Sequence, residues 1–282
     1  MNNIIIPNPE HLQQTQEQII KNGPNHLHII TDFDRTLTYS QGRDNKKIKS
    51  VISVLREHDY LSKEYSTKAK ALFEQYHPIE IDPNISQEAK KKSMETWWKT
   101  HNQLLLKSGL QKSHLEQIAE SGIIRLREGT KELFSYTHKQ QIPLVIFSSS
   151  GVGDTIQLIL EKENLMYNNV YIITNKFKWD KKGNAIRAPS HVIHALNKDE
   201  TSIQNFPDIY DKIKDRKNIL LLGDSLGDIK MAQGSDYKNI LKTGFLNPGE
   251  EKRQSEYEKN FDLIITGDSG LDPVNNILHQ IK

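Results

Sequence analysis

Short apolar runs alternate along the chain with longer stretches in which apolar residues recur every three or four positions. The runs span four to six residues, are rich in Val, Ile and Leu, and lie at 27–31, 142–147, 170–174, 218–222 and 262–265. Continuous apolar runs of this length are typical of strands buried on both faces of a parallel sheet, and the stretches between them predict covering helices. The pattern therefore predicts an α/β fold, a Rossmann-like doubly wound parallel sheet.

The pattern changes between the first two of these strands. Residues 44–121 hold no convincing strand, and the clearest helical spacing there covers 86–107, with Ser86 as a cap at its start. We therefore expect an all-helical cap domain at 44–121, inserted after the first strand into an α/β core domain that consists of 1–43 and 122–282.

Two smaller elements are set by their boundary residues. Asn8 as a cap, Pro9 at the first helical position and Gly23 just beyond the end predict a helix before the first strand. The polar sequence DKKG at 180–183 predicts the turn of a hairpin between two short strands.

Composition narrows the choice of chemistry. The 282 residues include no cysteine, which excludes a disulfide, a thiolate zinc site and a cysteine nucleophile. The 38 Lys and Arg side chains nearly balance 36 Asp and Glu, and the lysines form short clusters among acids, so we expect no nucleic-acid partner. No apolar segment has the length of a signal peptide or a membrane span, so we expect a cytoplasmic protein with no membrane partner.

Polar side chains follow the predicted strands, and ligands of doubly wound sheets bind at that edge. Asp32 and Asp34 come directly after the first strand and, two residues apart on an extended segment, project to the same side. The other members of the set are Ser148 and Ser149 after the second strand, Asp224 and Asp228 after the fourth, and Lys198 between them, with Lys176 and Lys178 as nearby alternatives for the lysine.

The residue types of this set indicate phosphoryl transfer. Carboxylates without a nearby His or Cys suit a hard cation such as Mg²⁺. Hydroxyls, a lysine and glycine-flanked backbone N–H groups suit a phosphate. One cation, one phosphate and one further carboxylate are what an aspartyl nucleophile needs to accept a phosphoryl group.

Four segments resemble, in order, the four motifs of the haloacid-dehalogenase (HAD) phosphatase superfamily. They are DFDRTL at 32–37, Ser148, Lys198 and GDSLGD at 223–228. The chain is most similar to one branch, the cytosolic type-three (pyrimidine) 5′-nucleotidases, through IITDFDRTL at 29–37, IEIDP at 79–83, IFSSSGVGD at 146–154 and LLGDSLGD at 220–228. The resemblance covers nearly the whole chain, and it implies a HAD core in which the helical insertion is the family's cap.

The resemblance also implies a role for each catalytic candidate. Asp32 would attack phosphorus to give an aspartyl-phosphate, and Asp34 would protonate the leaving ribose oxygen and then deprotonate the hydrolytic water. Ser148 and Lys198 would bind the phosphoryl oxygens, and Lys198 would offset repulsion between the phosphate and the carboxylates. Ser149 stays open as the phosphate ligand in place of Ser148, which is favoured because it directly follows the strand.

The metal site is implied in the same way. Mg²⁺ would be held by the Asp32 carboxylate, the Asp34 backbone carbonyl and Asp224, with Asp228 fixing the geometry one layer out or through water. These roles describe a Mg²⁺-dependent 5′-nucleotidase that hydrolyses pyrimidine nucleoside 5′-monophosphates to nucleoside and phosphate. Its partner is a small-molecule nucleoside monophosphate, and we expect a monomer.

The cap departs from the family pattern at the position that reads the nucleobase. The family places an acid directly before an aromatic pair, whereas here Glu95 is followed by Thr96 before Trp97 and Trp98. Glu95 and Trp98 lie three apart in the predicted helix, share a face, and are expected to meet the base by hydrogen bonding and stacking. The departure leaves the base preference open.

Other functions fit parts of the sequence. The same chemistry on 7-methylguanosine monophosphate or another small phosphomonoester, or transfer of the phosphoryl group to a nucleoside, needs the same residues. A serine-hydrolase elbow at 223–227 requires a later histidine, and His279 is the only one. The GVG at 151–153 resembles half of a dinucleotide fingerprint, but Ile156 replaces its third glycine. An RNA- or partner-binding module on the same fold would not need a nucleophile and an acid together.

Overall fold

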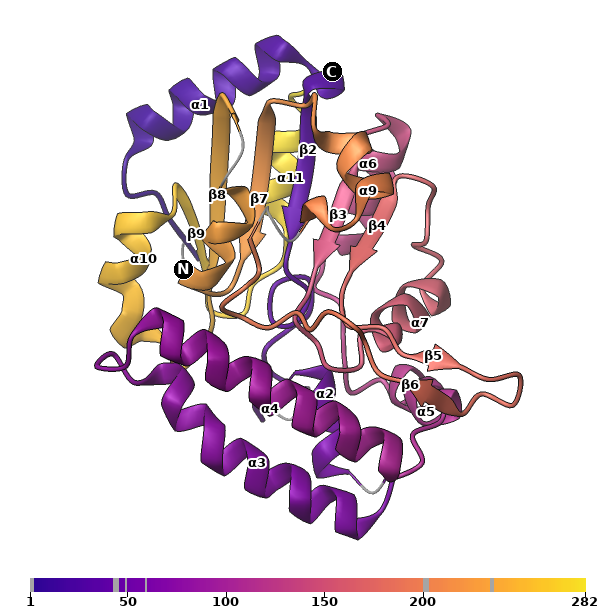
Figure 1. The fold of residues 1–282 in the computed structure, drawn as a ribbon. Coiled ribbons are helices and arrows are strands. Elements are labelled where there is room, and N and C mark those ends of the chain that lie inside the picture. Colours follow the sequence, from indigo (N-terminus) through magenta and orange to yellow (C-terminus); the bar gives the residue numbers. More distant parts are fainter. Residues whose placement is uncertain (1–2, 43–45, 49, 59, 200–202, 234–235) are drawn as a thin grey trace.

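The computed structural model describes residues 3–42, 46–48, 50–58, 60–199, 203–233 and 236–282. Its centre is a seven-stranded sheet in the order β1-β9-β8-β7-β2-β3-β4, in which β1 pairs antiparallel with β9 and all other neighbours are parallel (Figure 1). The strands are β1 (Ile4–Ile5), β2 (Leu27–Thr31), β3 (Leu144–Phe147), β4 (Val170–Ile173), β7 (Asn218–Gly223), β8 (Asn239–Leu246) and β9 (Leu263–Thr266).

Helices cover both faces of this sheet. In β3, Leu144 and Ile146 join an apolar cluster with residues of α6 and α11, whereas Val145 and Phe147 join a second cluster with Ile213 of α9. This alternation is the period of two that a strand imposes on its side chains. The helices are α1 (Pro9–Asn22), α2 (Val51–Glu57), α3 (Lys63–Ile81), α4 (Gln87–Lys107), α5 (Lys112–Glu120), α6 (Thr130–Lys139), α7 (Asp154–Lys162), α9 (Pro207–Ile213), α10 (Gln254–Asn260) and α11 (Asp272–Leu278), with 3₁₀ turns η1 (Pro24–His26), η2 (Leu226–Ala232) and η3 (Glu251–Arg253). The predicted doubly wound α/β class is confirmed.

Several predicted elements are confirmed at their ends. The Asn8 side chain caps α1 by accepting the His11 N–H at 3.0 Å, and Ser86 Oγ caps α4 by accepting the Ala89 N–H at 3.3 Å. The predicted hairpin is formed by β5 (Lys178–Trp179) and β6 (Ala185–Arg187), which pair antiparallel. The five strands expected from apolar runs correspond to β2, β3, β4, β7 and β9.

Two features differ from the expectation. Strand β8 was not predicted, because polar residues such as Lys242 lie in its partly exposed first half and interrupt the apolar run. The stretch after the fourth predicted strand, where a covering helix is expected, begins with the 3₁₀ turn η2, which carries Asp228. Asp228 accepts hydrogen bonds from both the backbone and the hydroxyl of Ser225, which draws this turn tight.

Helices α2 to α5 follow β2 in the chain and lie beyond the edge at which the parallel strands end, with α3 packed along α4 (Figure 1). Trp98 of α4 lies against the loop after β3, so closely that a Cβ added to Gly151 would come within 2.3 Å of its ring. The expected boundary between residues 43 and 44 lies outside the described residues, and the division into two domains stays a prediction. Among the described helices, none is long and apolar enough to cross a membrane.

Candidate active site

Two carboxylates directly follow β2, an interior strand of the sheet, at the edge where the parallel strands end. Asp32 extends the pairing of β2 with β7, because its N–H donates to the Leu222 carbonyl at 3.0 Å, and its side chain is buried. Asp34 Oδ1 accepts the N–H of Val51, the first residue of α2, at 3.0 Å. The first helix after β2 therefore holds the carboxyl group that is expected to act as the general acid.

Lys198 is a buried lysine that joins two carboxylates. Its Nζ lies 2.5 Å from Asp32 Oδ1 and 2.7 Å from Asp228 Oδ1, and its side chain is 3% exposed. The alternative Lys176 instead contacts Gln157 Oε1 at 3.4 Å on the surface. The structure therefore brings Lys198, 166 residues away along the chain, to Asp32.

The segment after β7 places the other two carboxylates. Asp228 Oδ2 accepts the Ser225 N–H at 2.9 Å and the Ser225 hydroxyl at 2.8 Å. Gly223 makes room for this arrangement, since a Cβ there would lie 2.4 Å from the Asp228 Cβ. Asp224 is buried, and its Oδ2 lies 2.9 Å from Arg35 Nη2.

The same geometry removes the serine-hydrolase alternative. The Ser225 hydroxyl donates to Asp228, while His279 Nε2 lies 3.3 Å from Glu132 Oε1. Within the part of the chain that the structure describes, no histidine contacts the Ser225 hydroxyl, so the serine has no base to activate it.

Burial and mutual repulsion shape the protonation of the cluster. The pKa of Asp34 is raised to about 7, by burial first and then by the charge of Asp32, against the Val51 N–H. Burial also raises the pKa of Asp32, against the charge of Lys198. Burial opposes the charge on Lys198, but Asp228 and Asp32 together outweigh it and raise the lysine pKa. Asp34 thus gains and loses its proton near neutral pH, beside a lysine that stays charged.

The donor set fits a hard divalent cation. Even with a proton on Asp34, three carboxylates face two cationic side chains, Lys198 and Arg35, so the cluster keeps an excess of negative charge that such an ion would neutralise. Among the described residues, no three His, Cys, Asp or Glu side chains gather into a complete ligand set. Mg²⁺ commonly takes one or two carboxylates beside main-chain carbonyls and waters, so the set implied by the motif, Asp32, Asp224 and the Asp34 carbonyl, is of the kind this ion accepts.

The predicted metal ligands differ in whether their carboxylate oxygens already accept hydrogen bonds. Both carboxylate oxygens of Asp228 already accept hydrogen bonds, one from Lys198 and the other from Ser225. Asp224 Oδ2 is buried and accepts no hydrogen bond of good geometry from the described residues. The Asp32 and Asp224 carboxylates are thus the side chains that fit a cation, whereas Asp228 orients Lys198.

The loop after β3 carries the expected phosphate ligands. Ser148 is buried, and its Oγ accepts the Ser150 N–H at 3.1 Å, which leaves the hydroxyl proton of Ser148 to donate elsewhere. Ser149 is half-buried. Both serines therefore keep a hydroxyl that can donate to phosphate, and the choice between them stays open.

Asn175 is a positioning residue that sequence reasoning missed. Its Nδ2 donates to the Ser150 carbonyl at 3.0 Å and to the Ile193 carbonyl at 2.8 Å, and its Oδ1 accepts the Ile193 N–H at 2.9 Å. It therefore clamps the serine loop to the segment that leads to Lys198. The only signal in the sequence is its place just after the third apolar run.

Arg127 is the second residue that was missed. It is buried in the connection between α5 and α6, and it braces the loop that follows Asp34. Its guanidinium donates to the carbonyls of Arg35 (2.8 Å), Thr36 (2.9 Å) and Ser269 (2.7 Å) and to Asn247 Oδ1 (2.6 Å), and lies 3.1 Å from Asp268 Oδ1.

The two predicted base-reading residues have different surroundings. Trp98 packs over Gly151 and stacks on Trp97, with ring centroids 5.6 Å apart and planes at 20°. Glu95 is 53% exposed, and its Oε1 pairs with Lys99 Nζ at 2.6 Å. The structure thus places Trp98 next to the serine loop, whereas contact of Glu95 with a base stays a prediction.

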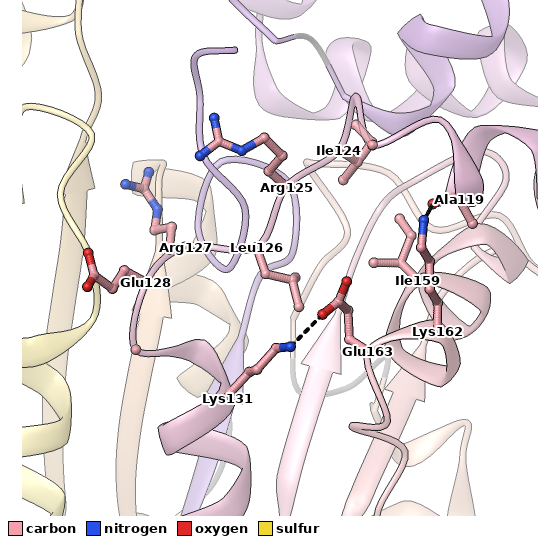
Figure 2. Close-up of a pocket in the computed structure, with 12 residues that line it drawn as sticks. Ala119, Ile124, Arg125, Leu126, Arg127, Glu128, Lys131, Ile159, Lys162 and Glu163 are labelled. Carbon is pink, nitrogen blue, oxygen red and sulfur yellow. Dashed lines mark hydrogen bonds and ion pairs between the residues drawn. The ribbon is translucent and has the colours of Figure 1, made fainter. Parts of the chain in front are cut away.

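A separate cavity of about 510 Å³ lies between the ends of α5 and α7 and the start of α6 (Figure 2). Lys131 pairs with Glu163 at 2.8 Å across its lining, and Lys162 Nζ donates to the Ala119 carbonyl at 3.1 Å. None of the predicted site residues lines this cavity. The carboxylate cluster, and not this hollow, is the candidate active site.

The model of the pyrimidine 5′-nucleotidase (UMPH-1) family matches residues 35–282. The chain belongs to this family. It is 35% identical to the 7-methylguanosine phosphate-specific 5′-nucleotidase of Gallus gallus over 98% of this chain and 95% of the relative, and 32% identical to that of Homo sapiens over 99% and 92%. Superposed on a crystal structure of cytosolic 5′-nucleotidase IIIB bound to cytidine, it gives a TM-score of 0.88 at 27% identity, covering 100% of this chain and 93% of that one.

The family resemblance inferred from the motifs is therefore confirmed. This member is a 5′-nucleotidase, an enzyme that hydrolyses phosphomonoesters, with the HAD fold. A probable phosphoserine phosphatase from Vibrio cholerae shares that fold with a TM-score of 0.54 at 16% identity over 93% of this chain and 68% of that one. The family match begins at residue 35, so the roles of Asp32 and Asp34 rest on the motif and on the geometry above.

Proposed function

We propose that this enzyme removes phosphate from nucleoside 5′-monophosphates with the help of Mg²⁺, by way of a covalent phosphate on Asp32. The observation that carries the proposal is the buried contact of Lys198 Nζ with Asp32 Oδ1 at 2.5 Å. Asp32 lies two residues before Asp34, the proposed general acid. A lysine in this place lowers the repulsion that an incoming phosphate meets from the carboxylates.

Two steps follow from these residues. In the first, a carboxylate oxygen of Asp32 attacks phosphorus, the bond from phosphorus to the ribose O5′ breaks, and Asp34 gives its proton to O5′. In the second, water attacks the same phosphorus, Asp34 takes a proton from that water, and the bond to Asp32 breaks to release phosphate. The raised pKa of Asp34 suits both transfers. Mg²⁺, when bound by Asp32, Asp224 and the Asp34 carbonyl, supplies positive charge against the phosphoryl oxygens.

Two observations bear on the nucleobase of the substrate: the side chains of the helical insertion and the names of the relatives. The family description favours a pyrimidine, and the cytosolic relative was solved with cytidine bound. Several relatives are named for 7-methylguanosine phosphate, whose positively charged ring is attracted by a tryptophan face and a carboxylate. Trp98 and Glu95 fit that chemistry, so 7-methylguanosine monophosphate is the second proposed substrate beside CMP and UMP.

A phosphate-release assay tests the chemistry. We expect turnover of a CMP, UMP, GMP and 7-methylguanosine monophosphate panel to need Mg²⁺, to stop with a chelator, and to fall by about 10³-fold or more in Asp32→Asn. Asp211→Asn, on the exposed surface of α9, is the matched control and should keep wild-type turnover. Undiminished turnover in Asp32→Asn would exclude the covalent route. Product analysis with an added nucleoside separates hydrolysis from phosphoryl transfer to that nucleoside.

We also propose that the enzyme works in the cytosol as a monomer. The name of the cytosolic relative supports the first part. The second is supported by the site itself, because Asp32, Lys198 and Asp228 all come from one chain.

A further inference from the structure

The positively charged side chain of Arg35 contacts Asp224, one of the two carboxylates that fit a metal ion. Arg35 Nη2 is 2.9 Å from Asp224 Oδ2, and Arg35 Nη1 is 3.3 Å from Glu250 Oε1. The guanidinium therefore bridges a buried carboxylate inside the active site and a second carboxylate outside the catalytic set.

The backbone sets this position. Arg35 has a left-handed φ of 63°, which is uncommon for a side chain with a Cβ. Its N–H donates to Thr38 Oγ1 at 2.8 Å, and its carbonyl accepts from Arg127 Nη2 at 2.8 Å and from Asn247 Nδ2 at 3.1 Å. Because both polar groups of the residue are held by buried partners, the arginine side chain starts from a fixed point next to the site.

The two contacts of the guanidinium are unequal. With Glu250 it makes a hydrogen bond, whereas its contact with Asp224 Oδ2 lacks hydrogen-bond geometry. The Arg35 side chain is 32% exposed, so it has room to turn. Glu250 also pairs with Arg253 at 3.2 Å, which keeps this carboxylate in place as an anchor.

We propose that Arg35 is an internal competitor of the metal ion: its guanidinium contacts both Asp224 and Glu250 when no cation is bound, and leaves Asp224 but keeps Glu250 when a divalent cation binds the Asp224 carboxylate. Two positive charges repel each other at one carboxylate, so the arginine stabilises the metal-free enzyme and weakens cation binding by the same coupling. This inference rests on the metal dependence in the proposed function.

Calorimetric titration of metal-free enzyme with Mg²⁺ alone tests the competition. We expect Arg35→Met and Arg35→Gln to bind Mg²⁺ about tenfold more tightly than wild type, which corresponds to about 1.4 kcal/mol. Arg253→Gln is the matched control, because it removes a positive charge from Glu250 without touching Asp224, and its affinity should stay within about twofold of wild type.

Thermal melting supplies a second readout without substrate. Arg35→Met should melt below wild type in a chelator, and the gap should shrink as Mg²⁺ saturates both proteins. Equal Mg²⁺ affinity in wild type and the Arg35 variants would overturn the inference, as would an equal gain in Arg253→Gln. If Arg35→Met does not fold, Arg35→Gln decides on the same criteria. Failure of wild type to bind Mg²⁺ would instead overturn the proposed metal dependence.

Discussion

At the scale of single residues, Arg127 shows how the catalytic loop is held. Its buried guanidinium donates to the carbonyls of Arg35 and Thr36 in the loop that follows Asp34, and it offsets the charge of Asp268, which is 10% exposed. A buried charge of this kind is stabilising only while its partners remain, because each partner left alone is a desolvated polar group. The conformation of Arg35, and with it the surroundings of Asp224, therefore depends on a side chain 92 residues away.

Arg127→Met should lower the free energy of unfolding by about 3–5 kcal/mol, because it removes the cationic partner of the Asp268 carboxylate and the side-chain donor to the carbonyls of Thr36 and Ser269. Urea unfolding at pH 7 measures this. Arg125→Met is the control on the same connection: Arg125 is half-buried and lies 4.9 Å over the Tyr39 ring, so a loss below about 1 kcal/mol is expected. Similar losses in the two variants would contradict the bracing role of Arg127.

At the scale of elements, helix α4 packs against the loop after β3, which carries the predicted phosphate ligands. Trp98 leaves no space for a Cβ on Gly151, so the loop and the helix approach as closely as a glycine allows. Asn175 ties the same loop to the segment that leads to Lys198. Elements from three distant parts of the chain thereby fix one another.

Gly151→Ala should cost about 1–3 kcal/mol of stability and raise KM more than it lowers kcat, because the new Cβ displaces Trp98 and not the carboxylates. A double-mutant cycle checks the cause. In a Trp98→Ala background the ring is gone, so Gly151→Ala should then cost less than about 0.5 kcal/mol. Full additivity of the two changes would show that the ring is not what the Cβ meets.

At the scale of the whole molecule, stability depends on pH through a histidine in the centre of the sheet. His28 of β2 is fully buried, and burial first, with the Arg216 charge second, lowers its pKa from 6.5 to about 3. The unfolded chain therefore takes up a proton below pH 6.5 that the folded chain refuses until about pH 3. This contribution to stability is complete above pH 6.5 and is lost as the pH falls.

His28→Leu should remove that loss. Between pH 6 and pH 4.5 the variant should gain on wild type by up to about 1.4 kcal/mol per pH unit, the value for one proton. Urea unfolding along a pH series measures the difference. The carboxylates with raised pKa values act in the opposite direction but are common to both proteins, so they cancel in the comparison. Parallel curves for the two proteins would mean that His28 titrates in the folded state as it does unfolded.

The sequence alone predicted much of the architecture. Continuous apolar runs report burial on both faces, so they predicted β2, β3, β4, β7 and β9, and boundary residues such as Asn8 predicted the start of α1. Strand β8 was not predicted, because Lys242 and its neighbours interrupt its run of apolar residues. Among the site residues, the carboxylates and Lys198 were found because their types and order match a motif, whereas Asn175 and Arg127 carry no pattern of their own.

Local spacing along the chain was sufficient for the fold class, the helical insertion and the chemistry of the strand ends, since these depend on which side chains are apolar, acidic or basic and at what interval. The choice of partners was made by packing in three dimensions. That Lys198 reaches Asp32, and that Arg35 turns onto Asp224, depends on backbone angles and on contacts between segments more than 150 residues apart. Such contacts depend on how the elements stack, and no interval in the sequence encodes that directly.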